Sequence, residues 1–170
     1  MWRLVLFVIG LALLLPAPAR AGQALRNGSF AEGTGASAPG WRTQKWSAEA
    51  GTEFDVLRDP EGIGIAAVRN PTPNDASWVQ SLSVEPSTWY RLAGRVRAIG
   101  VAESGGGVSL SPFEGLDRGR EVKGEDSGWQ RVEMWFKTRS DQRTATVACR
   151  LGTFGHLAAG EARCTEIELT

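Results

Sequence analysis

Apolar and polar residues alternate in short segments along this chain, and turn-forming residues separate the segments. Residues 52–57 alternate in this way up to the turn at Asp59-Pro60-Glu61-Gly62. Successive side chains of a β-strand point to opposite faces of its sheet, so alternation indicates strands with one buried face. Further strands are expected at residues 64–68, 77–84, 89–98, 108–113, 130–138, 144–151 and 162–169.

These strands define the expected fold class. No segment after Gly22 repeats apolar residues at helical spacing for three turns. Residues 42–49 are expected to form a polar loop, and residues 70–75 (NPTPND) a turn. Eight or so strands with polar turns between them predict an all-β fold, a two-sheet antiparallel β-sandwich of the jelly-roll type.

Two of the strands show which side chains face solvent. One face of 89–98 and of 130–138 is apolar, through Tyr90, Leu92, Val96, Ala98, Val132, Met134 and Phe136. The opposite face of each strand is charged or aromatic. We therefore expect one outer surface, if the two strands share a sheet, that carries Arg95, Arg97, Glu133 and Trp135.

The N-terminus has the pattern of a signal peptide. Arg3 precedes an apolar run, Leu4 to Leu15, and Ala19-Arg20-Ala21 follows as a cleavage signal. The run is too short to cross a hydrocarbon core of ~30 Å as a helix. We predict a signal peptide at 1–21 and a single domain at 22–170, with no membrane attachment after cleavage; a membrane anchor is the alternative.

The net charge and the cysteine content indicate which partners and which cellular compartment are expected. Removal of Arg3 and Arg20 with the signal peptide leaves 17 cationic and 19 acidic residues, so bulk charge favours neither nucleic acid nor an anionic membrane. Cys149 and Cys164 are the only cysteines and match no zinc pattern. We expect them to form a disulfide bond across a terminal hairpin in an extracytoplasmic (secreted or periplasmic) protein; two buried free thiols are the alternative.

An ordered set of short motifs resembles a known family. Asn27-Gly28-Ser29-Phe30 and Pro39-Gly40-Trp41 come first, and residues 74–80 and 84–92 follow. Residues 129–133, 150–152 and 160–162 complete the set. Together these motifs resemble the cellulase-C-type carbohydrate-binding modules of the galactose-binding-like jelly-roll superfamily, with 74–92 similar to their central hairpin.

The resemblance implies two antiparallel sheets, one of them curved into a sugar-binding face or cleft, and often a structural calcium ion. Two departures bear on the calcium. Ala31 and Thr165 stand where the family commonly has acidic residues associated with the metal. Such a site would have too few hard oxygen ligands for tight binding, although Glu32 or Glu166 could partly compensate. We therefore predict no metal and no cofactor. The family also commonly has an aromatic residue where Cys164 stands.

The tryptophans supply candidate sugar contacts, because a flat aromatic ring packs against the C–H face of a pyranose. Trp41 and Trp129 stand at strand entrances, where a packing role is favoured. The candidate ligand-binding residues are Trp46, Trp78, Arg95, Arg97, Glu133 and Trp135. The alternative for any of the aromatics is packing under loops or against a partner protein.

Catalytic groups are poorly represented. His156 is the only histidine and lies in an expected loop, and no triad surrounds Ser127. Glu53, Asp55 and Glu133 could form a carboxylate pair for glycoside cleavage, which spacing alone cannot test. We predict an exported, non-catalytic carbohydrate-binding domain that binds a poly- or oligosaccharide. A structural or protein-interaction jelly roll is the alternative, and a small glycan-cleaving enzyme is a third.

Overall fold

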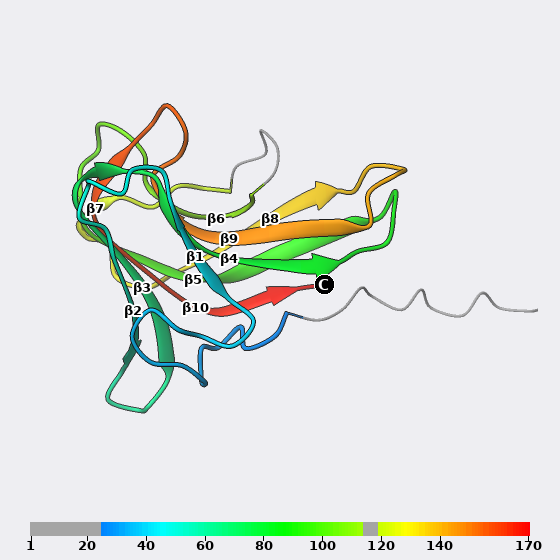
Figure 1. The fold of residues 1–170 in the computed structure, drawn as a ribbon, viewed down its shortest axis with the longest axis horizontal. Helices are drawn as coiled ribbons and strands as arrows, with labels where there is room; N and C mark the ends of the chain where they lie inside the picture. Colours follow the sequence, from blue (N-terminus) through cyan, green and yellow to red (C-terminus); the bar gives the residue numbers. More distant parts are fainter. Residues whose placement is uncertain (1–24, 114–118) are drawn as a thin grey trace, which may run out of the picture.

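The computed structural model describes residues 25–113 and 119–170, in which all regular secondary structure is β-strand. The expected signal peptide lies outside these residues. Antiparallel strands form two sheets that pack face to face (Figure 1). The predicted all-β sandwich is therefore confirmed. Within the described ranges, no helix is long and apolar enough to cross a membrane.

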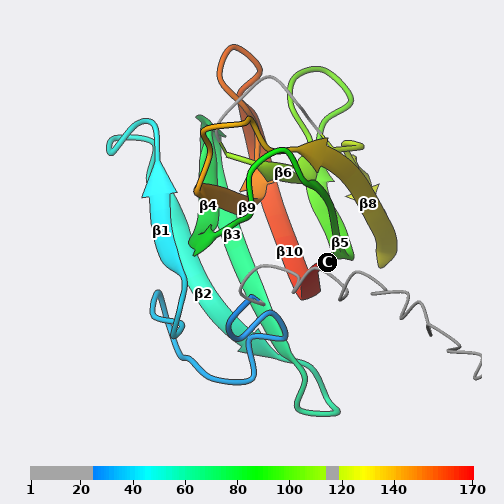
Figure 2. The same ribbon diagram turned by 90° about the vertical axis from the view of Figure 1, so that its right-hand side faces the viewer.

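The smaller sheet has four strands in the order β1-β4-β9-β6. Their bounds are β1 Arg42–Lys45, β4 Ala76–Ser83, β9 Thr144–Leu151 and β6 Val108–Pro112. The larger sheet runs β2-β3-β10-β5-β7, and β8 also pairs with β5. Its strands are β2 Glu53–Arg58, β3 Gly64–Asn74, β10 Ala158–Leu169, β5 Trp89–Val101, β7 Gly124–Asp126 and β8 Gln130–Lys137. Figure 2 shows the edge strands β1 and β2 on one side of the molecule and β8 on the other.

Three sequence-based expectations about local structure are wrong. The expected polar loop at 42–49 begins with strand β1, which pairs with β4 at the sheet edge. The expected turn at 70–75 is mostly strand, because β3 continues to Asn74. β10 pairs with Asn70 and Asn74 but skips the residues between them, so the two exposed prolines there need no ladder hydrogen bond. The expected central hairpin at 74–92 is also absent, since β4 and β5 belong to different sheets.

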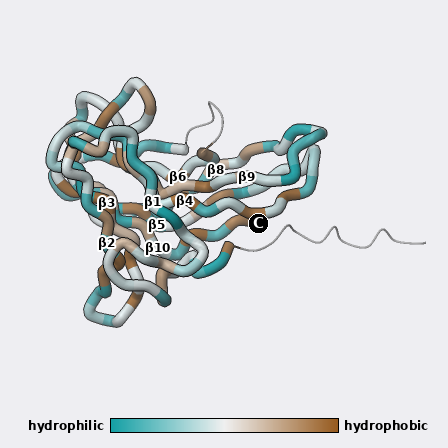
Figure 3. The backbone as a smooth tube through the Cα atoms, in the orientation of Figure 1, coloured by the Kyte–Doolittle hydropathy of each residue, from teal (hydrophilic) through white to brown (hydrophobic). Residues whose placement is uncertain are grey.

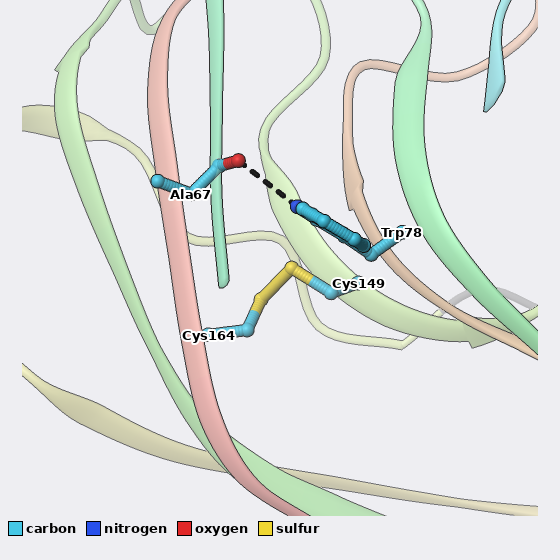
Figure 4. The surroundings of a disulfide bond; sticks show 4 residues. All are labelled: Ala67, Trp78, Cys149 and Cys164. Carbon is cyan, nitrogen blue, oxygen red and sulfur yellow. Dashed lines mark hydrogen bonds between the residues drawn. A yellow bond between two sulfur atoms is a disulfide. The ribbon is translucent and has the colours of Figure 1, made fainter. Parts of the chain in front are cut away.

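The core lies between the sheets. Strands β5 and β8 direct their apolar residues into it, as the alternation predicts, and hydropathy alternates along the chain in Figure 3. Trp41 and Trp78 are both buried, and the Trp41 ring lies 4.8 Å from that of Phe30. The Trp78 indole N–H donates to the carbonyl of Ala67 at 2.9 Å (Figure 4). The expectation that Trp78 contacts a ligand is therefore corrected: its ring is a core residue with a satisfied donor.

A disulfide bond joins the two sheets inside this core. Cys149 on β9 and Cys164 on β10 are bonded, with their Cα atoms 6.3 Å apart, and both residues are fully buried (Figure 4). The predicted pairing is confirmed. The expected terminal hairpin is wrong, because β9 and β10 lie in different sheets. The bond is thus a covalent link across the sandwich, next to Trp78, which pairs with Cys149 in the β4–β9 ladder.

Candidate functional site

The outer face of the larger sheet carries four of the predicted site residues. Strands β5 and β8 pair directly, and Trp135 is 57% exposed on the face opposite the core. Arg95, Arg97 and Glu133 lie on the same face. The predicted side-chain directions are thus confirmed for both strands, whereas contact with a ligand remains a prediction.

Ion pairs hold two of the predicted charged residues of this face. Glu133 accepts from Arg91 at 2.7 Å, and Arg97 binds Asp126 through two hydrogen bonds. The hydrogen bond from Arg97, followed by that from the backbone N–H of Gly128, lowers the pKa of Asp126 to about 2. The same hydrogen bond raises the pKa of Arg97.

Trp46 lies elsewhere, beside a groove of about 340 Å³ on the smaller sheet. Gln44, Ser77 and Arg150 follow one another in register across β1, β4 and β9. Their neighbours Trp78 and Cys149 face the core, so this row faces outward. The groove is lined by Gln44, Lys45, Trp46, Asp75, Ser77, Phe113, Arg150 and Phe154.

Two exposed aromatic rings form one wall of the groove. Trp46 is 69% and Phe154 70% exposed, and their ring centroids lie 5.6 Å apart at an interplanar angle of 73°. Phe154 sits in a tight turn closed by two hydrogen bonds of 2.9 Å between the backbones of Thr153 and His156. The rings therefore meet edge to face, and backbone hydrogen bonds hold the turn that carries Phe154.

Backbone hydrogen bonds also hold the Trp46 segment. The N–H of Trp46 donates to the carbonyl of Asp75 at 2.8 Å. The side-chain amide of Asn74 both accepts from the N–H of Ser47 and donates to its carbonyl, each at 3.0 Å. Asn74 is fully buried and also donates to Thr52 at 2.8 Å. The exposed indole is thus presented by a segment anchored to the core.

A charged pair forms the floor of the groove. The Arg150 guanidinium donates to both carboxylate oxygens of Asp75, from Nε at 2.7 Å, and the two side chains are only 13% and 11% exposed. The guanidinium also lies 5.3 Å from the ring centroid of Phe113. Aromatic side chains combined with a few fixed polar groups are typical of a small-molecule binding site.

Comparison with proteins of known structure identifies the type of fold. No protein-family model matches the sequence, and no curated protein does. Among solved structures, a CBM4 module is 13% identical at a TM-score of 0.56, covering 86% of this chain and 98% of its own. The CBM22-1 xylan-binding domain of Paenibacillus barcinonensis Xyn10C is 20% identical at a TM-score of 0.51, covering 89% and 96%. TmCBM61, solved with β-1,4-galactotriose, is 17% identical at a TM-score of 0.51, covering 89% and 99%.

The chain has the fold of carbohydrate-binding modules. The resemblance seen in the sequence motifs is thereby confirmed at the level of the fold. These identities are low, so the likeness concerns the backbone architecture, and the residues of the groove must be judged on their own chemistry.

The calcium ion that the resemblance implies does not fit this chain. Near the expected position, the carbonyls of Phe30, Ala31 and Gly33 accept from the guanidinium of Arg58 at 2.9, 3.0 and 3.1 Å. The hydroxyl of Thr165 donates to the carbonyl of Gly64 at 2.7 Å. In the described residues, no three His, Cys, Asp or Glu side chains gather as a metal site would require. The Arg58 guanidinium, itself a cation, thus binds the carbonyl oxygens around position 31.

The candidate catalytic groups are only partly brought together. Glu133 on β8 lies four strand spacings from β2, roughly 19 Å, which is too far for it to form a glycosidase carboxylate pair with Glu53 or Asp55. Glu53 and Asp55 share the outer face of β2 and line a pocket of about 160 Å³ with Glu161. The Ser127 hydroxyl is bonded to the backbone, accepting from Ala98 and donating to Gly128. His156 is exposed in the turn that presents Phe154.

Sequence reasoning missed most of the groove. It identified Trp46 but not Asp75, Phe113, Arg150 or Phe154. The glycines at 152 and 155, both with positive φ, bracket Phe154, and an aromatic residue within a glycine-bounded turn is a signal for an exposed ring. Asp75 and Arg150 lie 75 residues apart, and nothing local in the sequence indicates that they meet.

Proposed function

We propose that this protein is a non-catalytic domain that binds a glycan in the groove beside Trp46 and Phe154. The observation that carries the proposal is a pair of exposed aromatic rings next to a nearly buried Asp75–Arg150 pair. Large aromatic rings are rarely left in solvent without a partner, and these two are held in place by anchored turns.

The groove supplies the two kinds of contact that a sugar needs. A ring can stack on the C–H face of a pyranose, while the exposed Gln44 and Lys45 and the Asp75–Arg150 pair offer donors and acceptors for its hydroxyl groups. Because the rings meet at 73°, they cannot lie together on one flat surface. This corner suits an individual glycan chain in the groove.

The outer face of the larger sheet is a second place where a glycan could bind. Trp135 and Trp89 are 57% and 60% exposed there. Beside Trp135, Arg91 is paired with Glu133 at 2.7 Å. The groove combines two neighbouring aromatic rings with a nearly buried charged pair, so it is the site that we propose for the glycan, and Trp135 is the matched comparison.

We further propose that the chain is exported. The N-terminal pattern of residues 1–21 and the fully buried disulfide between Cys149 and Cys164 support a secreted or periplasmic location. Mass spectrometry of protein recovered from outside the cytoplasm tests this directly: a mature N-terminus at Gly22 is expected, and an uncleaved chain would contradict the proposal.

A glycan array followed by calorimetry tests binding. The purified protein should bind at least one poly- or oligosaccharide, and Trp46→Ala should weaken that binding about thirtyfold. Stacking that buries on the order of 80 Å² of apolar surface contributes ~2 kcal/mol at ~25 cal/mol per Å². Trp135→Ala should bind as the unaltered protein does. Loss of affinity in Trp135→Ala instead would move the site to the outer face, and no binding to any glycan would favour a protein-interaction jelly roll.

A further inference from the structure

A second concave site lies on the outer face of the larger sheet, on the opposite side of the sandwich from the groove. It is a pocket of about 560 Å³. Arg95 and Arg97 reach it from β5, Arg163 from β10, and Trp129 from the segment before β8. Leu57, Ile63 and Ile65 add an apolar wall beside the β2–β3 turn. We call it the arginine pocket.

The arrangement of these arginines is unfavourable for the sheet alone. Arg163 and Arg97 are direct cross-strand neighbours, and in the next outward row Arg95 stands opposite Arg131. Like charges directly opposite each other in an antiparallel pair destabilise it. Each of these four arginines has a carboxylate partner that offsets part of the repulsion, and the two pairs side by side concentrate positive charge next to the pocket.

Carboxylates bind these arginines at the rim of the pocket. Arg97 pairs with Asp126, Arg163 with Glu161 at 2.6 Å, and Arg95 with Glu166 at 3.5 Å. None of these three carboxylates is among the described residues that line the pocket. The acidic groups therefore orient the guanidinium groups without filling the space between them.

Many guanidinium N–H groups remain available. In the described part of the chain, Arg95 makes no side-chain hydrogen bond, and Arg163 donates only from Nε. Arg97 donates from Nε and one Nη, both to Asp126. Guanidinium groups bind carboxylate, sulfate and phosphate oxygens through strong, charge-assisted hydrogen bonds. The pocket thus offers donors from three arginines to one guest.

Two acidic side chains do line the pocket, both from the β2–β3 turn. Asp59 is used within the turn, where its Oδ1 accepts from the N–H of Ile63 at 2.6 Å. Glu61 is exposed. An anion in the pocket would be repelled by Glu61, and this repulsion gives the test below a variant that should strengthen binding.

We propose that the arginine pocket is an anion-binding site that takes the carboxylate or sulfate group of an acidic saccharide. The Arg95 guanidinium lies over the half-buried Trp129 ring, with its central carbon 5.5 Å from the ring centroid, so the charged group is held in place against an aromatic side chain. The site is separate from the groove at Trp46 and does not depend on glycan binding there.

The test uses Arg163→Gln, Glu61→Gln and Arg139→Gln. Removal of Arg163 leaves Glu161 paired with Arg69 at 3.0 Å, so no carboxylate loses its only partner. Arg139 is exposed in the β8–β9 turn and paired with Asp141, and its variant has the same change in net charge. Calorimetric titrations at low and moderate salt use hexagalacturonate, a neutral hexasaccharide and inorganic sulfate as probes.

Hexagalacturonate should bind the unaltered protein more weakly as salt rises. Arg163→Gln should weaken the binding of hexagalacturonate about tenfold, which is the lower end of the effect of one hydrogen bond to a charged group. Glu61→Gln should strengthen this binding severalfold, and Arg139→Gln should leave it unchanged. Inorganic sulfate bound with the same dependence on Arg163 would support the anion site and show that the anion alone suffices. If neither anion binds, or if Arg163→Gln and Arg139→Gln behave alike, the proposal is overturned. Binding of the neutral sugar through Trp46 should not change in any of these variants.

Discussion

Removal of the Cys149–Cys164 disulfide should reveal how much the covalent link between the sheets contributes to stability. The sequence separation is 15 residues. In the chain-entropy model a loop of this length reduces the freedom of the unfolded chain by about 3 kcal/mol at 25 °C. The double variant Cys149→Ala/Cys164→Ala should lose at least that much, because it also removes two buried sulfur atoms.

Urea unfolding of the oxidised protein and of the double variant measures this loss as a difference in the free energy of unfolding. In a thermal scan, a difference of about 3 kcal/mol should lower the melting temperature by roughly 6–12 °C for a domain of this size. The reduced, unaltered protein is the control, because it lacks the crosslink but keeps both sulfur atoms in the core. A loss below about 1 kcal/mol in the double variant would refute the view that the bond restricts the unfolded chain.

Three further predictions concern charged groups. Arg58→Gln should lower the free energy of unfolding, measured in urea, by about 1–2 kcal/mol, because hydrogen bonds to backbone carbonyls are lost. A chelator should leave the melting temperature of the unaltered protein unchanged, and a sharp fall in that temperature would reveal a calcium site. Asp75→Asn should cost about 3 kcal/mol, because Arg150 stays charged in a nearly buried position, whereas the exposed Asp141→Asn should cost less than 1 kcal/mol; equal losses would contradict this. Since the pKa of Asp126 is lowered to about 2, its stabilising effect should be present above pH 4 and disappear only as the pH falls through 2; an NMR titration midpoint near 4 would show that the ion pair does not form in solution.

The alternation of residues predicted most of the sandwich. Where apolar and polar residues alternate, as in 89–98 and 130–138, both the strand and its outward face are correct, because each strand has one face in the core. The pairing of Cys149 with Cys164 is correct for a different reason: two buried cysteines in one small domain have no other partner. Local pattern and simple counting were sufficient for these features.

The alternation of residues does not predict which strands pair with each other. Alternation does not show whether consecutive strands pair with each other or cross to the other sheet, so the terminal hairpin was expected where an inter-sheet link occurs. An aromatic residue at a strand entrance is compatible with either face of the sheet, so the local sequence does not show that Trp78 is buried. Its partners, Ala67 and Cys149, come from distant segments.

The candidate site was only partly predictable for the same reason. The row of Gln44, Ser77 and Arg150 exists only because β1, β4 and β9 are neighbours, an order that non-consecutive strands adopt on folding. The arginine pocket likewise depends on β10 lying between β3 and β5. Each contributing residue is ordinary in its own segment, and the chemistry appears when the segments meet.

The most direct test of glycan binding in the groove is an NMR titration that follows the indole N–H signals of the tryptophans. With an oligosaccharide selected on the array, the Trp46 signal should move progressively as sugar is added, while that of the buried Trp78 should stay in place. Trp89 and Trp135, on the other sheet, should also remain unchanged. Movement confined to Trp135 and Trp89, with Trp46 unaffected, would contradict the proposed site.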